Sequence, residues 1–286
     1  MKSINTANMS RLEWLQHRRS GIGGSDVAAI LGLSKWRSPY NVWADKTGKF
    51  PVNDEGNEFT HWGNVMEPIL AKEFESVTGK KVYRQNKTFI HPKYDFLRAD
   101  IDRDIANEGG FLEIKTAMEY KSDEWSDDKV PIAYQLQVQH YMNVLGREYC
   151  YFAALIGGHK FIVKKVERDQ GAIDMIESKL VTWWRDYVET DTPPDVDGDV
   201  STTAALRAMY PDEDGEIITL PSSFDERLER RNFLKNAQKE YDRDISQVEN
   251  EIRLALGEAS GGQTDKFRIT NHANKRGTKI LRIKEI

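Results

Sequence analysis

Apolar residues recur at intervals of three and four along the longer segments of the chain and alternate with polar residues along the shorter ones. The first pattern is typical of amphipathic helices and the second of half-buried strands. Helices are predicted over 10–20, 38–47, 58–78, 131–145 and 170–188, and strands over 81–91, 149–156 and 159–167. This order of elements predicts an α/β or α+β fold, in which helices flank a β-sheet.

Residues 96–118 are predicted to form two strands joined by a turn rich in Asn and Gly. Residues two apart share a strand face, so Asp100 and Asp102 point the same way, as do Glu113 and Lys115. If the strands pair, Asp102 and Glu113 could converge beside Lys115. Two carboxylates suit Mg²⁺ or Mn²⁺, which would make this hairpin a site for attack on a phosphodiester. The alternative is a solvated strand face, and the hairpin alone favours that alternative.

A glycine-rich turn at 21–26 separates the first helix from a short helical segment at 27–31. Ser25 is predicted to cap the second helix, whose N-terminal amides could hold an anion. Arg18 lies one turn after Trp14 on the first helix and adds a guanidinium suited to phosphate. The alternative is a tight glycine turn followed by a serine cap with no ligand.

Two helices carry polar side chains beside apolar faces. Glu67 stands next to the apolar stripe of 58–78 and could support a metal site as an outer ligand, or could be a surface group. Tyr134 and Gln137 lie on the apolar face of 131–145. They could orient a metal-bound water or touch a DNA backbone. The alternative is that they form hydrogen bonds within the core.

The sequence Thr192-Pro193-Pro194 predicts a boundary between a domain at 1–192 and an extension at 193–286. Residues 222–257 are predicted to form a long charged helix, followed by a short β-hairpin. Its heptad-like apolar positions are Leu234, Tyr241, Ile245, Val248, Ile252 and Ala255. These heptads are too few for a stand-alone coiled coil, so the helix is expected to pack on the body or on a partner subunit.

Composition excludes several classes of protein. The chain has 286 residues, 39% hydrophobic and 30% charged, which fits a folded soluble protein. The single cysteine, Cys150, excludes an internal disulfide framework, a thiolate zinc site and a four-cysteine iron–sulfur cluster. A cytoplasmic location is expected, and no membrane span or secretory signal is predicted. The net charge of −5 leaves DNA binding open, because a nuclease needs basic groups only along one channel.

Four motifs occur in order within residues 10–188. They are Trp14 with Arg18-Arg19-Ser20-Gly21-Ile22-Gly23-Gly24-Ser25-Asp26, Trp62-Gly63-Asn64-Val65-Met66-Glu67-Pro68, Asp102 with Glu113-Ile114-Lys115-Thr116, and Ala133-Tyr134-Gln135-Leu136-Gln137-Val138-Gln139. Through these motifs the chain resembles the YqaJ-type phage recombination nucleases, which are relatives of lambda exonuclease in the (D/E)-x-K nuclease superfamily. The resemblance implies a restriction-endonuclease-like core with a central mixed β-sheet, and a C-terminal helical and β appendage.

The resemblance also implies a role for each matching residue. Asp102 and Glu113, with the carbonyl of Ile114, match the metal ligands of the family. Lys115 matches the lysine that positions or activates the attacking water, and Glu67 matches the helix glutamate that supports the metal site.

The remaining matches lie around this centre. Tyr134 and Gln137 match the helix pair that borders the metal site. Arg18, Arg19 and Ser25 match the groups that bind DNA and its terminal 5′-phosphate.

One position departs from the family pattern. Relatives usually have Asp-Gly where this chain has Asp102-Arg103, so a non-glycine residue must make the bend there. Asp100 and Asp104 also flank Asp102, which leaves the choice of ligand open.

The implied function is that of a Mg²⁺-dependent 5′–3′ exodeoxyribonuclease, with Mn²⁺ as a substitute, acting on the ends of double-stranded DNA. It would leave 3′ single-stranded overhangs for a single-strand annealing partner in phage-type recombination within a bacterial host cell. The family relation also implies a homo-oligomer, with a ring as one form. The alternatives are a structure- or site-specific endonuclease that uses the same residues, and a non-catalytic DNA-binding or assembly protein with a relict fold.

Overall fold

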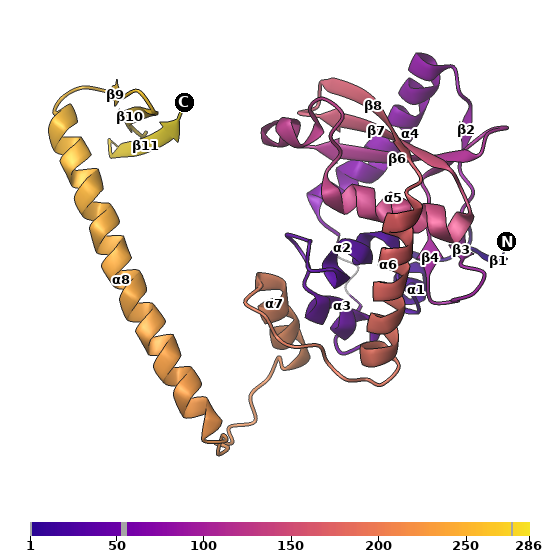
Figure 1. Cartoon of the computed structure of the whole chain (residues 1–286), viewed down its shortest axis with the longest axis horizontal. Helices are drawn as coiled ribbons and strands as arrows, with labels where there is room; N and C mark the ends of the chain where they lie inside the picture. The colour runs from indigo at the N-terminus through magenta and orange to yellow at the C-terminus, as the bar shows by residue number, and fades with distance from the viewer. Residues whose placement is uncertain (1, 53–55, 276) are drawn as a thin grey trace. The chain divides into compact units, whose positions relative to one another are not determined.

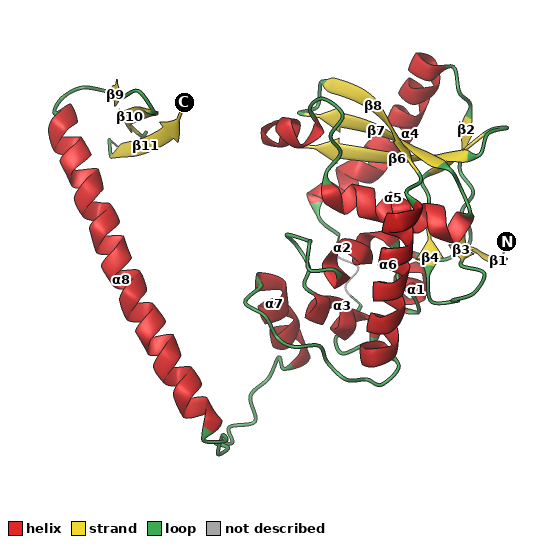
Figure 2. Ribbon diagram, in the orientation of Figure 1, coloured by secondary structure: helices red, strands yellow, loops and turns green. Residues whose placement is uncertain are grey.

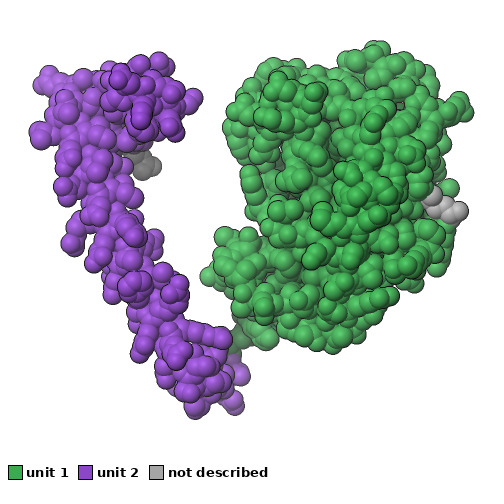
Figure 3. All heavy atoms as spheres, viewed as in Figure 1, with its two compact units in different colours: residues 1–213 green, residues 214–286 purple. Residues whose placement is uncertain are grey.

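The computed structural model describes residues 2–52, 56–275 and 277–286, and the chain forms two compact units. Unit 1 is Met1–Glu213 and unit 2 is Asp214–Ile286, and Figure 3 colours them separately. The division lies beyond the expected boundary at 192/193, because helix α7 (Val200–Met209) packs against α3 (Pro39–Lys46). The Ser38 amide donates to Ser201 Oγ at 2.8 Å, which ties α7 to unit 1.

The helices of unit 1 are shown in Figure 1. They are α1 (Arg11–Arg19), α2 (Gly24–Ile30), α3, α4 (Glu58–Thr78), the 3₁₀-helix η1 (Glu119–Trp125), α5 (Ile132–Leu145), α6 (Gln170–Trp183), its π-helical continuation η2 (Trp184–Val188), and α7. Ser10 and Glu13 form a capping box at the start of α1, with the Glu13 amide 3.2 Å from Ser10 Oγ. Gly79 ends α4 at a φ of 72°, a left-handed conformation that glycine adopts at little cost. On the apolar side of α4, Leu70 and Phe74 are buried, but Val77 in the last turn is exposed.

Figure 2 shows the strands of unit 1, which belong to two sheets. The central sheet has the order β2 (Val82–Tyr83), β5 (Arg103–Ile105), β6 (Gly110–Ala117), β7 (Tyr149–Ile156) and β8 (Lys160–Glu167). The strands β6 and β7 are parallel and the other neighbours are antiparallel, so the sheet is mixed, as predicted. The second sheet contains β1 (Lys2–Asn5), β3 (Lys87–Ile90) and β4 (Arg98–Ala99). The predicted strand at 81–91 is therefore two strands, one in each sheet.

Alternation along β6 decides which side chains face which helix. Leu112 and Ile114 belong to the core cluster that packs against α4. Phe111 belongs to the larger core on the opposite face, which includes α5. Because successive side chains on a strand alternate, Glu113 and Lys115 point to the same face as Phe111. The two candidate catalytic side chains on β6 are therefore directed toward α5.

Unit 2 consists of one long helix and a small sheet. The elements are α8 (Ser223–Leu256), β9 (Gly261–Gln263), β10 (Phe267–Ala273) and β11 (Lys279–Glu285). The sheet is antiparallel, with β10 in the middle, so β9 adds a strand to the predicted hairpin. Within the described ranges of the whole chain, no helix is both long enough and apolar enough to cross a membrane.

Candidate active site

Strands β5 and β6 form the predicted hairpin, and their register fixes the position of Asp102. Residues 103–104 pair with residues 111–112 in antiparallel register. Asp102 therefore lies beside the middle of β6, where its Oδ2 accepts a hydrogen bond from the Ile114 amide at 2.7 Å. Asp100 instead accepts from a threonine hydroxyl of β3 at 2.5 Å. Asp102 is thus the aspartate that contacts the strand of the Glu-x-Lys motif.

Glu113 is almost completely enclosed, with 1% of its surface exposed. Its Oε2 accepts hydrogen bonds from Lys115 Nζ and Gln137 Nε2, both at 2.9 Å. Its Oε1 is buried as well, and no hydrogen-bond partner for it occurs among the described residues. Burial, reinforced by the charge of Asp102, raises the pKa of Glu113 to about 8. The carboxylate therefore has less positive charge around it than it needs to stay ionised.

Lys115 lies between the carboxylates and an aromatic ring. Its Nζ is 2.9 Å from Glu113 Oε2 and 5.2 Å from the centroid of the Tyr134 ring. Burial alone would lower the pKa of Lys115, but Glu113 and Asp102 outweigh it and raise that pKa. The ammonium therefore keeps its proton at neutral pH, which favours an electrostatic role over that of a base.

Helix α5 supplies both residues that were predicted to border the site. Gln137 is buried and donates directly to Glu113, which fixes the orientation of that carboxylate. Tyr134, one turn earlier, reaches the site through its ring over Lys115. The structure thus brings these two residues of α5 together with Asp102, Glu113 and Lys115. The catalytic roles of all five residues stay predictions.

Glu67 lies near Asp102 and forms an ion pair with an arginine of strand β5. Its Oε1 pairs with Arg103 Nη1, and Arg84 Nη2 lies 3.8 Å away. Arg103 Nη1 also donates to the Asp102 carbonyl at 2.7 Å. Because Arg103 is a residue of strand β5, the chain bends after Asp102 without a left-handed conformation. Arg103, at a position where the resemblance implies glycine, thus links Glu67 to the hairpin of β5 and β6.

The donor set fits one hard cation. Within the described ranges, no group of three or more His, Cys, Asp and Glu residues could hold a metal. Asp102 and Glu113 are the two carboxylates that converge, and Mg²⁺ is often held by one or two carboxylates with water completing its shell. The buried, unpaired Oε1 of Glu113 is the atom that such a cation would satisfy. Ile114 contacts the site through its amide, and a role for its carbonyl stays a prediction.

The glycine-rich turn differs in one detail from its prediction. Helix α2 begins at Gly24 with Gly23 as its N-cap, so the prediction that Ser25 is the N-cap was wrong. The helix starts earlier because the Asp26 side chain accepts from the Gly23 amide at 3.0 Å. Ser25 lies in the first turn, where its Oγ accepts from Arg18 Nη2 at 2.7 Å. Arg18 also stacks on Trp14, with its Cζ 4.9 Å from the ring centroid.

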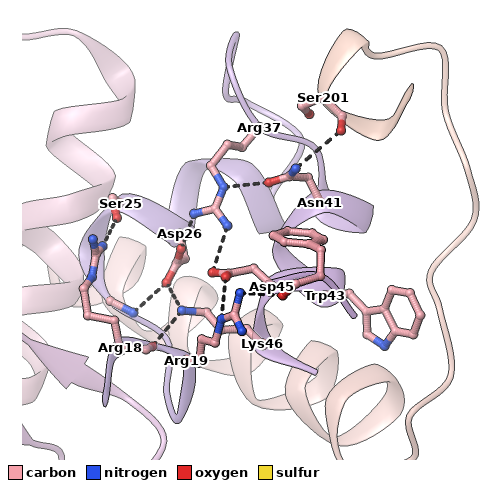
Figure 4. A network of polar contacts seen from close by, with 12 residues as sticks. Arg18, Arg19, Ser25, Asp26, Arg37, Asn41, Trp43, Asp45, Lys46 and Ser201 are labelled. Atoms are coloured by element: carbon pink, nitrogen blue, oxygen red, sulfur yellow. Dashed lines mark hydrogen bonds and ion pairs between the residues drawn. The ribbon is translucent and has the colours of Figure 1, made fainter. Parts of the chain in front are cut away.

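Asp26 is the buried centre of the network in Figure 4. Its carboxylate pairs with Lys46 Nζ at 2.7 Å and Arg37 Nη1 at 2.8 Å. Lys46 also donates to the Arg18 carbonyl at 3.0 Å, so α3 supports the end of α1. Burial alone would raise the pKa of Asp26, but Lys46 and Arg37 outweigh it and hold that pKa far below its usual range. This cluster fixes the backbone that presents Arg18 and Ser25.

Arg19 points into the same network and away from Ser25. Its Nε pairs with Asp45 at 3.1 Å, and its Nη2 donates to the Phe50 carbonyl at 2.9 Å. A cavity of about 310 Å³ lies beside these groups and is lined by Arg18, Arg19, Arg37 and Lys46 among others. Arg19 is therefore engaged in structural contacts, and DNA binding by this residue stays a prediction.

Gly24 packs the glycine-rich turn against helix α5. A Cβ at this position would lie 2.5 Å from Gln137 Cγ and 2.6 Å from Tyr141 Cε1. Only a glycine lets α2 approach α5 this closely. The same α5 residue that orients Glu113 therefore packs against the first residue of α2.

Comparison with known proteins decides the family. The YqaJ-like viral recombinase domain matches residues 13–148. The uncharacterized protein YqaJ of Bacillus subtilis (strain 168) is 42% identical over 259 residues, covering 90% of this chain and 81% of that protein. The chain belongs to the YqaJ family.

Solved structures place the fold of this YqaJ-family chain. The alkaline exonuclease LHK-Exo from Laribacter hongkongensis has a TM-score of 0.52 and 20% identity, covering 63% of this chain and 93% of that chain. LHK-Exo in complex with dAMP has a TM-score of 0.53 over the same coverage. The predicted family and the predicted restriction-endonuclease-like core are confirmed. The match to the YqaJ-like domain and the likeness to the alkaline exonuclease structures support the predicted enzyme class, a nuclease.

Sequence reasoning missed three residues that organise this YqaJ-family site. Asp26 and Lys46 form the buried pair behind the glycine-rich turn at 21–26, and Arg103 neutralises Glu67. The capping-box position of Asp26, three residues after Gly23, was a local signal for its bond to the turn. Nothing local in the sequence indicates that Lys46 would pair with Asp26, because the two residues lie on different helices. The same holds for Glu67 of helix α4 and Arg103 of strand β5.

Proposed function

We propose that this YqaJ-family protein is a Mg²⁺-dependent exodeoxyribonuclease that degrades one strand of duplex DNA from its 5′ end. The observation that carries the proposal is the unpaired, buried Oε1 of Glu113, next to Asp102 and Lys115. A buried carboxylate group that shares its one lysine with a second carboxylate, and has one oxygen unpaired, is incompletely neutralised and well suited to hold a cation. Mn²⁺ has the same preference for oxygen ligands and should substitute.

The residues of the site divide the work between them. Asp102 and Glu113 would hold the metal, which would supply a bound water of lowered pKa and neutralise charge on the phosphate. Lys115, kept protonated by Glu113, would stabilise the charge that develops on the attacked phosphate. Gln137 holds the Glu113 carboxylate in one orientation.

The glycine-rich turn at 21–26, with Arg18, supplies the recognition of the DNA end in this proposal. The guanidinium of Arg18, stacked on Trp14 and bonded to Ser25, lies at the N-terminus of α2. A guanidinium, a hydroxyl and helix N-terminal amides together suit a terminal 5′-phosphate. LHK-Exo, which shares this fold, has been solved with dAMP, a 5′-monophosphate.

The proposed partner of the enzyme follows from the DNA that the reaction would leave. Degradation from the 5′ end leaves a 3′ single-stranded overhang, which is the substrate that a single-strand annealing protein needs. We therefore propose duplex DNA with free ends as the substrate and an annealing protein as the functional partner. A homo-oligomer, in ring form or another, would keep the enzyme on its strand.

Digestion of a linear duplex labelled at one 5′ or one 3′ end tests the activity. With Mg²⁺, the 5′ label should be released first and the 3′ label last, and a covalently closed circle should stay intact. Cutting of the circle would favour the endonuclease, and early release of the 3′ label would reverse the polarity. Absence of any Mg²⁺- or Mn²⁺-dependent degradation would favour a relict fold.

A single substitution tests the end recognition. On 5′-phosphorylated ends, the Arg18→Ala variant should degrade DNA about tenfold more slowly than the wild type, or slower still, because a charge-assisted contact to the phosphate is lost. On 5′-hydroxyl ends the variant and the wild type should be alike. Equal slowing on both kinds of end would assign Arg18 to folding or general DNA binding instead.

A further inference from the structure

Helix α8 carries an apolar stripe that the rest of unit 2, in its described residues, leaves largely uncovered. Leu234, Tyr241, Ile245 and Val248 are 50%, 68%, 58% and 54% exposed. Ile252 and Leu256, near the end of the helix, are half-buried, and Leu256 lies against Gly262 of β9. Most of the stability of a protein helix comes from burying one such face. A helix of 34 residues therefore requires a partner surface along most of its length.

Charged residues are sorted along the edges of this stripe. With Ile245 and Ile252 at heptad position a, and Tyr241 and Val248 at position d, the flanking positions are e and g. In the first half of α8 these flanking positions carry Arg230 and Lys235, and in the second half they carry Asp242, Asp244, Glu249 and Glu251. The stripe is therefore bordered by positive charge at one end and by negative charge at the other.

This distribution opposes a parallel pair of α8 helices. In a parallel coiled coil, position g of one helix meets the following position e of its partner. Arg230 would then face the partner's Lys235, and Asp244 would face the partner's Glu249. Both contacts join like charges, which destabilises the pair.

We propose that α8 pairs antiparallel with α8 of a second copy of this chain. In that arrangement Leu234 packs against the partner's Ile245, and Gln238 against the partner's Tyr241. The same register places Arg230 beside the partner's Glu251 and Lys235 beside the partner's Asp242. Two-fold symmetry makes each of these contacts twice. The second copy thus covers the stripe and matches its charges at both ends.

Three polar residues on the stripe fit the same partner. Arg227, Arg231 and Gln238 occupy a or d positions. The aliphatic stem of an arginine can cover apolar surface while its head reaches a charge. Arg231 lies level with the partner's Val248, next to the acidic flank, so its head has carboxylates within reach. Polar residues at such positions favour one register at some cost in affinity.

Charge exchange between two variants of the full chain tests the proposal. The basic-end variant is Arg230→Glu/Lys235→Glu, and the acidic-end variant is Asp242→Lys/Glu251→Lys. Either variant alone faces like charges in the antiparallel pair, and its dissociation constant should rise by about tenfold or more. An equimolar mixture restores every opposite-charge contact and should associate as the wild type does. A chain that carries all four substitutions should also regain self-association.

Sedimentation velocity over a range of concentrations measures these outcomes, and far-UV circular dichroism checks that α8 stays helical. A control variant, Lys239→Glu/Arg243→Glu, changes the charge equally on the outer face and should associate normally. A wild-type chain that stays monomeric would overturn the proposal, because no second copy would then cover the stripe. A basic-end variant that associates normally would overturn the antiparallel orientation. A mixture that fails to associate would overturn the pairing itself. None of these outcomes depends on nuclease activity.

Discussion

Two buried lysine–carboxylate clusters in unit 1 differ in how completely their charges are matched. Asp26 has Lys46, Arg37 and the Gly23 amide around it, and its pKa is held far below the usual range. Lys46 in turn has a lowered pKa, because burial of its ammonium outweighs its attraction to Asp26.

In the second cluster, Glu113 and Asp102 share Lys115. Burial, together with the neighbouring carboxylate, raises the pKa of Glu113 to about 8, and one of its oxygens has no partner among the described residues. The first cluster is complete as it stands, and the second lacks a positive charge. The comparison separates a pair that holds the backbone from the proposed cation site, in which two carboxylates share one lysine.

The largest difference should appear in activity. Lys115→Ala should reduce Mg²⁺-dependent DNA degradation by about a thousandfold, because a charge aimed at the reacting phosphate is lost. The substitution should leave the fold intact. Release of label from a 5′-labelled duplex measures the rate, and circular dichroism checks the fold. Lys165→Ala, which removes a lysine from an exposed ion pair on β8, is the matched control and should retain full activity. Near-normal activity of Lys115→Ala would remove the basis for the proposed nuclease site.

The Asp26 cluster should instead respond in stability. Asp26→Asn leaves the ammonium of Lys46 buried without its counter-charge, and should lower the free energy of unfolding by about 3 kcal/mol. All seven tryptophans lie in unit 1, so their fluorescence during urea unfolding reports this unit. Asp191→Asn, which breaks the more exposed ion pair with Lys49, should change the free energy by less than about 0.5 kcal/mol. If both variants lose less than about 0.5 kcal/mol of unfolding free energy, the Asp26–Lys46 pair does not stabilise unit 1 as its burial indicates.

Gly24 lies between the two clusters, so its substitution should disturb both. Gly24→Ala places a Cβ 2.5 Å from Gln137 Cγ, and α2 must move away from α5. We expect a loss of about 1–3 kcal/mol in stability, together with reduced activity through Gln137. Gly23→Ala is the matched control, because its Cβ would lie 3.8 Å from Asp26 Oδ2 in ordinary contact. Its loss at the N-cap should stay below about 1 kcal/mol. Equal effects of the two substitutions would show that the approach of α2 to α5 is not tight.

The same comparison explains what the sequence could predict. The site on β6 follows from a local rule, since residues two apart share a strand face, and Glu113 and Lys115 obey it. Asp102 joins them because a hairpin register is also local. Asp26 and Lys46 lie on different helices, and their contact depends on how α2 packs on α3. Sequence periodicity indicates that each helix exists and does not indicate this packing.

Two further details depended on contacts between distant residues. Ser25 was predicted as a cap because serine favours that position, but the bond from the Gly23 amide to Asp26 starts the helix earlier. Arg103 had no explanation in the sequence, because its partner Glu67 is 36 residues away on α4. In both cases the role of the residue depends on which group its side chain, or that of a neighbour, contacts. The fold class was predictable from element order, whereas these charge partners required the packed structure.

The smallest expected effect, taken over a single pH unit, is a difference in pH dependence. The folded-state pKa of Glu113, about 8, lies above its ordinary value of 4.5, so the native carboxyl keeps a proton that the unfolded chain releases. The stability of the metal-free protein should therefore fall as pH rises between those values, by at most about 1.4 kcal/mol per pH unit. The depressed pKa of Asp26 has the opposite sign, since its contribution is present above the unfolded pKa and is lost only in acid. The raised pKa of Lys115 leaves its charge unchanged in this range.

Thermal unfolding in a chelator from pH 5 to pH 8.5 measures that effect. The melting temperature of the wild type should fall relative to that of Glu113→Gln, which cannot ionise. Added Mg²⁺ should reverse the fall for the wild type and leave Glu113→Gln unchanged, because a bound cation supplies the missing charge and displaces the proton. Parallel curves for the two proteins in the chelator would mean that Glu113 ionises normally. In that case the two clusters would not differ in charge balance, and the unpaired oxygen alone would have to account for metal binding.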